Sequence, residues 1–257
     1  MVKEIRNDDI DALVIVPLYP QFSISTSGSS LRALAEEFAK CGDSNSKMTQ
    51  TVIPSWHTRP GYVASVSNLI QNEIDLFTQE QLEEGGDVHI LFSAHGVPES
   101  YIEAGDPYQS HIMECVELIT SKLLQLEPDS TCLPQRVLKR DNVHLSYQSR
   151  VGPIQWLRPY TDTVLPELGA DGVKNLVVVP ISFVSEHVET LEEIDIEYRE
   201  LAEENGIENW RRCPALNTDA GFLDDMANMV IEALSEPVQT GKLLYFKKSK
   251  SCTNRTN

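Results

Sequence analysis

Short apolar runs recur along the chain, each bounded by turn-forming or polar residues. The runs are rich in Val, Ile and Leu and are too short for helices, a pattern typical of strands buried in a parallel sheet. They cover residues 12–17, 51–54, 88–92, 144–147 and 176–180.

Segments with helical periodicity separate these strands. Asp106 followed by Pro107 is typical of the start of a helix, because the carboxylate accepts from free backbone N–H groups and proline fits the first turn. The alternation of strands and helices predicts an α/β fold with parallel strands and right-handed crossovers. The expected helices cover residues 30–40, 63–76, 108–126, 161–168 and 189–204.

Two segments depart from this alternation. Residues 128–140 are polar and contain two prolines, which predicts a loop insertion. Residues 237–257 show no periodic apolar face and end in KKSKSCTNRTN, which predicts a disordered tail.

The composition excludes several functional classes. Of the 257 residues, 21 are Lys or Arg and 39 are Asp or Glu, so the formal charge is −18. Such a field repels nucleic acid and anionic membrane surfaces and attracts cations. No apolar run is long enough to span a bilayer. The five cysteines include no CxxC pair, so we expect a reducing compartment and neither a disulfide framework nor a structural zinc site.

Ligands of open α/β sheets bind beyond the carboxyl ends of the strands. His95 and Gly96 lie just after the strand expected at residues 88–92. An imidazole at this position suits a metal ligand or a proton acceptor. It equally suits a histidine hydrogen-bonded into the rim of the sheet, and the sequence leaves both interpretations open.

Acidic residues follow the strand expected at residues 176–180. Glu189, Glu193 and Glu197 are spaced four residues apart, which places them in a line on one face of the expected helix. Like charges at this spacing destabilise a helix by about 0.2–0.5 kcal/mol per pair. The line is therefore either a solvated acidic face or a track of oxygen ligands for a divalent cation.

Two loops at the same edge carry aromatic residues. Trp156 lies in a loop with Gly and Pro, where it could stack on a flat ligand or anchor the loop on the core. Tyr19 lies in the loop at residues 18–30, whose Ser, Thr and Gly residues could receive an anion at a helix N-terminus or simply cap that helix. The loop lacks the GxxxxGK[ST] pattern of nucleotide-binding loops.

Five segments at these positions carry long, ordered motifs. The motifs are LYPQFSISTSGSSL (18–31), LFSAHGVP (91–98), GDPY (105–108), YQSRVGPIQWLRPYT (147–161) and ISFVSEHVETLEEIDIEY (181–198). They resemble those of the ferrochelatases, which insert ferrous iron into protoporphyrin IX in the last step of heme synthesis. The resemblance runs from about residue 10 to 236, apart from the insertion, and is closest to the plant and cyanobacterial branch, which implies a plastid.

The resemblance implies a chelatase-like fold of two Rossmann-like halves with parallel sheets, the first half being incomplete in this chain. Residues 18–180 would form the complete second half. Residues 1–17 and 181–236 would be the remnant of the first half, whose opening strands and helices would precede this sequence.

The resemblance also implies catalytic roles. His95 and Glu189 would face each other across the porphyrin and share two tasks, removal of the pyrrole protons and delivery of Fe²⁺, with neither task assigned to either residue. Glu193 and Glu197 would join them in handling the metal.

Tyr19, Tyr147 and Trp156 would bind the porphyrin. Ferrous iron would be a substrate, with no permanently bound cofactor and no iron–sulfur cluster. The family also allows a peripheral association with a membrane.

Three alternatives stay open. The chain could be a truncated relative that binds porphyrin or metal without catalysis. It could be an incomplete product whose uncovered strand edges and apolar helix faces prevent stable folding. It could also be a cobalt chelatase of the same fold, although HVETLEEIDIEY is more similar to the iron branch.

Overall fold

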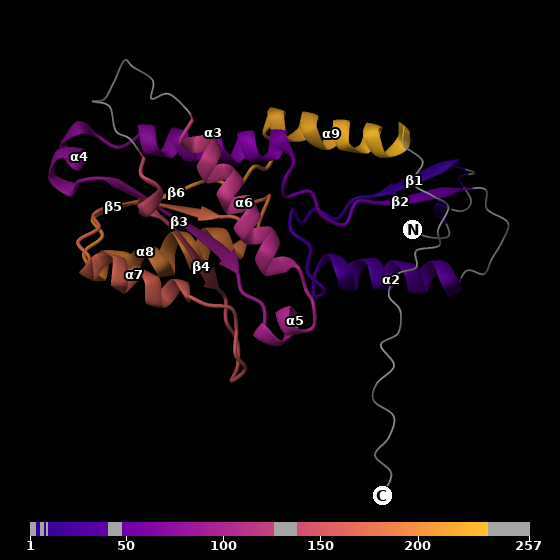
Figure 1. Cartoon of the computed structure of the whole chain (residues 1–257), viewed down its shortest axis with the longest axis horizontal. Coiled ribbons are helices and arrows are strands. Elements are labelled where there is room, and N and C mark those ends of the chain that lie inside the picture. The colour runs from indigo at the N-terminus through magenta and orange to yellow at the C-terminus, as the bar shows by residue number, and fades with distance from the viewer. Residues whose placement is uncertain (1–3, 6–7, 9, 41–47, 126–137, 236–257) are drawn as a thin grey trace, which may run out of the picture.

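The computed structural model describes residues 4–5, 8, 10–40, 48–125 and 138–235. Strands and helices alternate along this part of the chain (Figure 1). In order, the elements are β1 (Ala12–Ile15), α2 (Ser27–Lys40), β2 (Thr49–Val52), α3 (Pro60–Asp75), α4 (Gln79–Gly85), β3 (Val88–His95), α5 (Glu99–Glu103), α6 (Tyr108–Leu123), η1 (Arg140–Asn142), β4 (Val143–Gln148), α7 (Thr161–Ala170), β5 (Asn175–Pro180), η2 (Glu189–Glu197), α8 (Tyr198–Glu204), β6 (Asn209–Arg212) and α9 (Ala220–Ser235).

The strands form two parallel sheets. The larger sheet has the order β4-β3-β5-β6, and the smaller one pairs β1 with β2. Figure 1 shows the small sheet beside the main body, with α2 and α9 next to it. These pairings confirm the predicted α/β fold with parallel sheets.

Both faces of the large sheet are covered, which explains why its central strands are apolar throughout. Along β3, Ile90 and Phe92 pack on one face in the core cluster that contains α3, α6 and α9. Leu91 points to the other face and packs with α7 and α8. All three side chains are fully buried, and each such burial stabilises the fold by about 1.5–3 kcal/mol.

The five predicted strands are all present, but the sequence did not reveal β6. Its residues, Asn-Trp-Arg-Arg, contain no apolar run, and the strand lies at the edge of the sheet beside β5. At an edge, only Trp210 needs to be buried, while the two arginines stay partly accessible.

The helix expected at residues 189–204 is corrected by the structure. Residues Glu189–Glu197 form a π-helix, η2, and only Tyr198–Glu204 form an α-helix. The wider turn is visible at its end, where the N–H of Tyr198 donates to the carbonyl of Glu193, five residues earlier. The helix predicted at 108–126 is present as α6, which ends at Leu123. Its N-cap is Pro107 and not the predicted Asp106, although the Asp106 carboxylate does accept from the N–H of Tyr108.

The strand pairing crosses both boundaries of the predicted division into halves. The strand β2, within residues 18–180, pairs with β1, and β6, within residues 181–236, extends the sheet of β3 and β5. The division into two halves stays a prediction.

Two predicted segments lie largely or wholly outside the described residues. These are the insertion at 128–140, of which only 138–140 are described, and the tail at 237–257. Among the helices that are described, none has the length and apolar character needed to cross a bilayer.

Candidate active site

The parallel sheet brings several chain segments together at its carboxyl edge. The strand β3 ends at His95, its neighbour β4 ends at Gln148, and β5 ends at Pro180 and leads toward η2. Residues 95, 149 and 189 are far apart in the sequence but meet here because all three strands run in the same direction.

The His95 ring is held in one tautomer. Its Nδ1 lies 2.7 Å from the carbonyl oxygen of Gly96, and because a carbonyl only accepts hydrogen bonds, Nδ1 carries the ring proton. In the neutral ring, Nε2 is then an unprotonated base. It faces the Glu189 carboxylate at 3.6 Å, and the two side chains are 37% and 33% exposed. A base and a carboxylate that face each other in an accessible site can hold a proton or a cation between them.

Glu189 has polar contacts at both its backbone N–H and its carboxylate. It is the first residue of η2, and its N–H donates to Nδ1 of His187, 3.1 Å away. One oxygen of its carboxylate lies 3.3 Å from the hydroxyl oxygen of Ser149. Ser149 itself follows β4 and has a positive φ of 62°, which turns the chain toward η2.

Glu193 is engaged more tightly than Glu189. Its carboxylate accepts from the Ser149 hydroxyl at 2.6 Å, from the Ser149 N–H at 3.1 Å and from the Tyr198 hydroxyl at 3.0 Å. Burial, followed by the Glu193 charge, raises the pKa of Tyr198, so that its hydroxyl stays a donor. The structure therefore joins Glu193 to Glu189 through Ser149.

Glu197 lies at the exposed end of η2. Among the residues that the structure describes, no three His, Cys, Asp or Glu side chains converge closely enough to hold a metal ion. The predicted acidic track is thus two linked carboxylates and a third exposed one, not a closed metal cage.

Trp156 packs against Gly96, the residue after His95. A side-chain carbon added at Gly96 would lie only 3.2 Å from the indole ring. The Trp156 Nε1 donates to the carbonyl of Val151 at 2.9 Å, and its backbone bridges to Pro98. The half-buried Trp156 therefore anchors its loop beside Gly96.

The other two predicted aromatic contacts are placed differently. Tyr147 is only 2% exposed and belongs to the core, where burial raises its pKa to about 12. Tyr19 is 41% exposed on the loop after β1. The structure thus brings His95, Glu189, Glu193 and Trp156 together, but it does not bring Tyr147 to the open surface of the site.

Sequence reasoning did not single out the residues that support the site. Phe183 contacts the His95 ring edge-on, with 6.2 Å between centroids, and also packs against His187 at 4.2 Å. Ser149 links the two glutamates, and Tyr108 and Ser182 bond the backbone of His95. All five lie inside the quoted motifs, but no periodicity or spacing in the sequence marks them.

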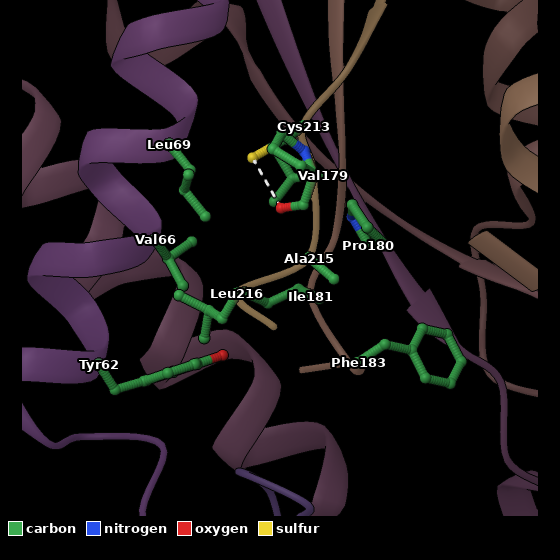
Figure 2. Close-up of a pocket in the computed structure, with 11 residues that line it drawn as sticks. Tyr62, Val66, Leu69, Val179, Pro180, Ile181, Phe183, Cys213, Ala215 and Leu216 are labelled. Carbon is green, nitrogen blue, oxygen red and sulfur yellow. Dashed lines mark hydrogen bonds between the residues drawn. The ribbon is translucent and has the colours of Figure 1, made fainter. Parts of the chain in front are cut away.

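A separate apolar pocket lies between α3 and the ends of β5 and β6. Figure 2 shows Tyr62, Val66 and Leu69 from α3 facing Cys213 and Leu216. Cys213 is buried with a raised pKa, since burial disfavours the thiolate. The residues that line this pocket include no charged side chain.

Fold and site together define a chelatase-like α/β protein. The structure resembles that described as SirB from Bacillus subtilis with Fe³⁺, with a TM-score of 0.58 over 90% of this chain and 74% of the other. The sequence identity is 13%, so this likeness concerns the fold alone.

The chain belongs to the ferrochelatase family. The family model named Ferrochelatase matches residues 1–234. Curated ferrochelatases from Picosynechococcus sp., Nostoc punctiforme and Trichodesmium erythraeum are 52%, 53% and 54% identical over 93%, 92% and 91% of this chain. The matches cover 57%, 56% and 55% of those proteins, so the chain spans a little over half the length of these relatives.

Proposed function

We propose that the protein inserts Fe²⁺ into protoporphyrin IX to form heme. The observation that carries this proposal is the facing pair at the sheet edge, in which Nε2 of His95 lies 3.6 Å from the Glu189 carboxylate. Membership of the ferrochelatase family supports the choice of porphyrin and iron as substrates.

The reaction breaks two pyrrole N–H bonds, leaves both electron pairs on the nitrogens, and forms iron–nitrogen bonds without change of oxidation state. His95 Nε2 accepts the protons one at a time and passes them to solvent. Glu189 holds Fe²⁺ with an incomplete set of protein ligands, so the ion can leave for the porphyrin nitrogens.

The remaining predicted residues receive supporting roles in the same proposal. Glu193 and Glu197 continue the negative charge from Glu189 along η2 and serve the passage of iron or protons. Trp156 and Tyr19 offer accessible ring surface to the macrocycle. Tyr147, which is buried, contributes only to the wall behind the site.

The test is heme formation by this chain from Fe²⁺ and a soluble porphyrin under anaerobic, reducing conditions. We expect turnover by the native chain, and none by His95→Ala. The matched control is His89→Gln, which alters a histidine at the other end of the same strand and should keep the activity. A folded native chain that forms no heme would overturn the proposal.

A second candidate function is porphyrin or metal binding without turnover. Quenching of porphyrin fluorescence without heme formation would select this function over catalysis, and robust turnover would exclude it.

We also propose that iron enters only as substrate, without an iron–sulfur cluster. Clusters bind thiolates, whereas burial raises the pKa of Cys115 to about 12 and also raises that of Cys213. An absorption spectrum after anaerobic reconstitution with iron and sulfide tests this, and cluster bands in the visible range would contradict it.

The cellular setting belongs to the proposal as well. Relatives in cyanobacteria at 51–54% identity support a plastid-type origin, from which we propose a chloroplast location and a peripheral contact with its membranes. Fluorescent tagging of the gene product and fractionation of the organelle would test both.

A further inference from the structure

The backbone of His95 lies beyond the end of the neighbouring strand. The pairing of β3 with β5 ends at Ser93 and Pro180, so β5 offers no main-chain partner to His95. Two side chains take its place. The His95 N–H donates to Oγ of Ser182 at 2.9 Å, and the His95 carbonyl accepts from the Tyr108 hydroxyl at 2.8 Å.

The two hydroxyl groups also bond to each other, at 2.8 Å. Only one arrangement of protons satisfies all three contacts. The Tyr108 hydroxyl donates to the carbonyl, so Ser182 must donate to Tyr108 while it accepts from the N–H. The result is a closed ring of hydrogen bonds in which every donor has an acceptor.

Both side chains are themselves firmly placed. Tyr108 begins α6 and is 6% exposed, and its N–H is bound by the carboxylate of Asp106. Ser182 lies two residues after β5 and is 9% exposed. Burial raises the pKa of Tyr108, so its hydroxyl keeps the proton that the ring of bonds requires.

The ring of bonds reaches the imidazole through one peptide unit. The carbonyl of His95 is bound by Tyr108, and the N–H of Gly96 donates to the carbonyl of Gln148 at 2.9 Å. Both polar atoms of this peptide are therefore fixed. The next carbonyl along the chain, that of Gly96, holds Nδ1 of His95.

We propose that Tyr108 and Ser182 are positioning residues, which hold His95 in the tautomer and orientation that aim Nε2 at the site. Neither residue contacts the reacting atoms in this arrangement. The kinetic part of the inference rests on the proposed function, whereas the part that concerns the ring tautomer does not.

The first test is nitrogen NMR of the histidine side chains in the full chain, with His95 assigned from the spectrum of His95→Gln. We expect one tautomer in the native chain, with the proton on Nδ1. Tyr108→Phe and Ser182→Ala should each produce a mixture of tautomers. Ser182→Thr keeps a hydroxyl and should restore the native signal.

The matched control is Tyr62→Phe, which also removes a buried tyrosine hydroxyl from the core. In the native chain that hydroxyl contacts Cys115 and not His95. It should leave the His95 signal unchanged. If Tyr108→Phe fails to fold, the pair Ser182→Ala and Ser182→Thr decides. A native His95 signal in folded Ser182→Ala and Tyr108→Phe would overturn the inference.

Kinetics supply the second test. Misplacing a catalytic group costs up to about 100-fold, so we expect kcat to fall about 10- to 100-fold in Tyr108→Phe and Ser182→Ala. The KM for porphyrin should stay the same. If the native chain shows no turnover but the tautomer changes occur, the proposed function fails while the positioning role stands. Unchanged kcat beside an active native chain would contradict the kinetic part.

Discussion

Gly96 is packed closely between the end of β4 and the indole ring of Trp156. A side-chain carbon there would lie 2.9 Å from the Gln148 carbonyl and 3.2 Å from the Trp156 ring. Gly96→Ala should therefore displace the ring or the strand end, with a loss of about 1–3 kcal/mol of unfolding free energy. Urea unfolding measures the loss, and Trp156 fluorescence should shift.

The fluorescence change is assigned by repeating the measurement in Trp156→Phe, which removes that emitter and keeps Trp56 and Trp210. A Gly96→Ala variant with native stability and native emission would show that the site tolerates a side chain at this point.

Ser149 combines a conformational and a chemical role. Its φ of 62° is strained for any residue with a side chain, and its hydroxyl and N–H bind Glu193. Ser149→Gly loses the hydroxyl but relieves the strain, whereas Ser149→Ala loses the hydroxyl and keeps the strain. We expect Ser149→Ala to be the less stable of the two by about 1 kcal/mol in urea unfolding. Equal stabilities would mean that the backbone relaxes away from the positive φ.

At the scale of whole elements, sequence patterns predicted what burial requires. The five apolar strands and the position of His95 at the carboxyl end of β3 followed from the need to bury central strands and from the place where parallel sheets bind ligands. The strand β6 was not predicted because an edge strand needs little apolar surface. The π-helix was not predicted because the spacing of the glutamates indicates only that they share a helix face. It does not indicate which carbonyl accepts the hydrogen bond from each backbone N–H.

The residues that support the site, such as Ser149 and Ser182, were not predicted for another reason. Ser182 and His95 are 87 positions apart, and Ser149 and Glu193 are 44 apart. Only the three-dimensional order of the strands makes them neighbours. Single polar residues in loops carry no periodicity, so nothing in the sequence distinguishes these serines from ordinary loop residues.

A pair of histidines, His89 and His144, links β3 and β4 at the end of the sheet opposite His95. Nδ1 of His89 lies 3.0 Å from Nε2 of His144, and the rings are parallel within 2°. One ring must donate and the other accept, so the pair is suited to the neutral state. Burial lowers the pKa of both, even though Asp87 near His89 and Asp171 near His144 act in the opposite direction and Lys139 reinforces the effect on His89.

The sign of the pH dependence follows from these shifts. Because the folded-state pKa values lie below the unfolded value of about 6.5, the unfolded chain binds more protons, and stability falls as the pH drops below that value. His144→Gln removes one titrating ring and should flatten the slope by at most about 1.4 kcal/mol per pH unit.

Urea unfolding between pH 7.5 and 5 measures this slope. His89→Gln should flatten it similarly, and the double variant should show that the two effects are not additive, since the rings titrate as a pair. A slope unchanged in both single variants would contradict the prediction. We expect some pH dependence to remain in the double variant, because burial also lowers the pKa of His111.

At the scale of the molecule, the net charge of −18 dominates the electrostatics. Salt affects the stability of the fold in two opposing ways. It weakens exposed ion pairs such as Lys139–Asp87 and Arg140–Glu117, each worth about 0–1 kcal/mol. It also screens the repulsion among the excess carboxylates, as the screening length shortens from about 30 Å at 0.01 M to about 8 Å at 0.15 M.

Repulsion should prevail, because the unbalanced charges act over the longer distances that salt screens most, while paired charges only a few ångströms apart are screened least. We therefore expect the Tm to rise as sodium chloride increases over this range. Charge-reversing substitutions supply the control: Glu197→Lys, at an exposed position on the acidic face, should raise the Tm at low salt and reduce its salt dependence. A Tm that falls with salt would show that the exposed ion pairs, and not the net charge, govern the stability of the fold.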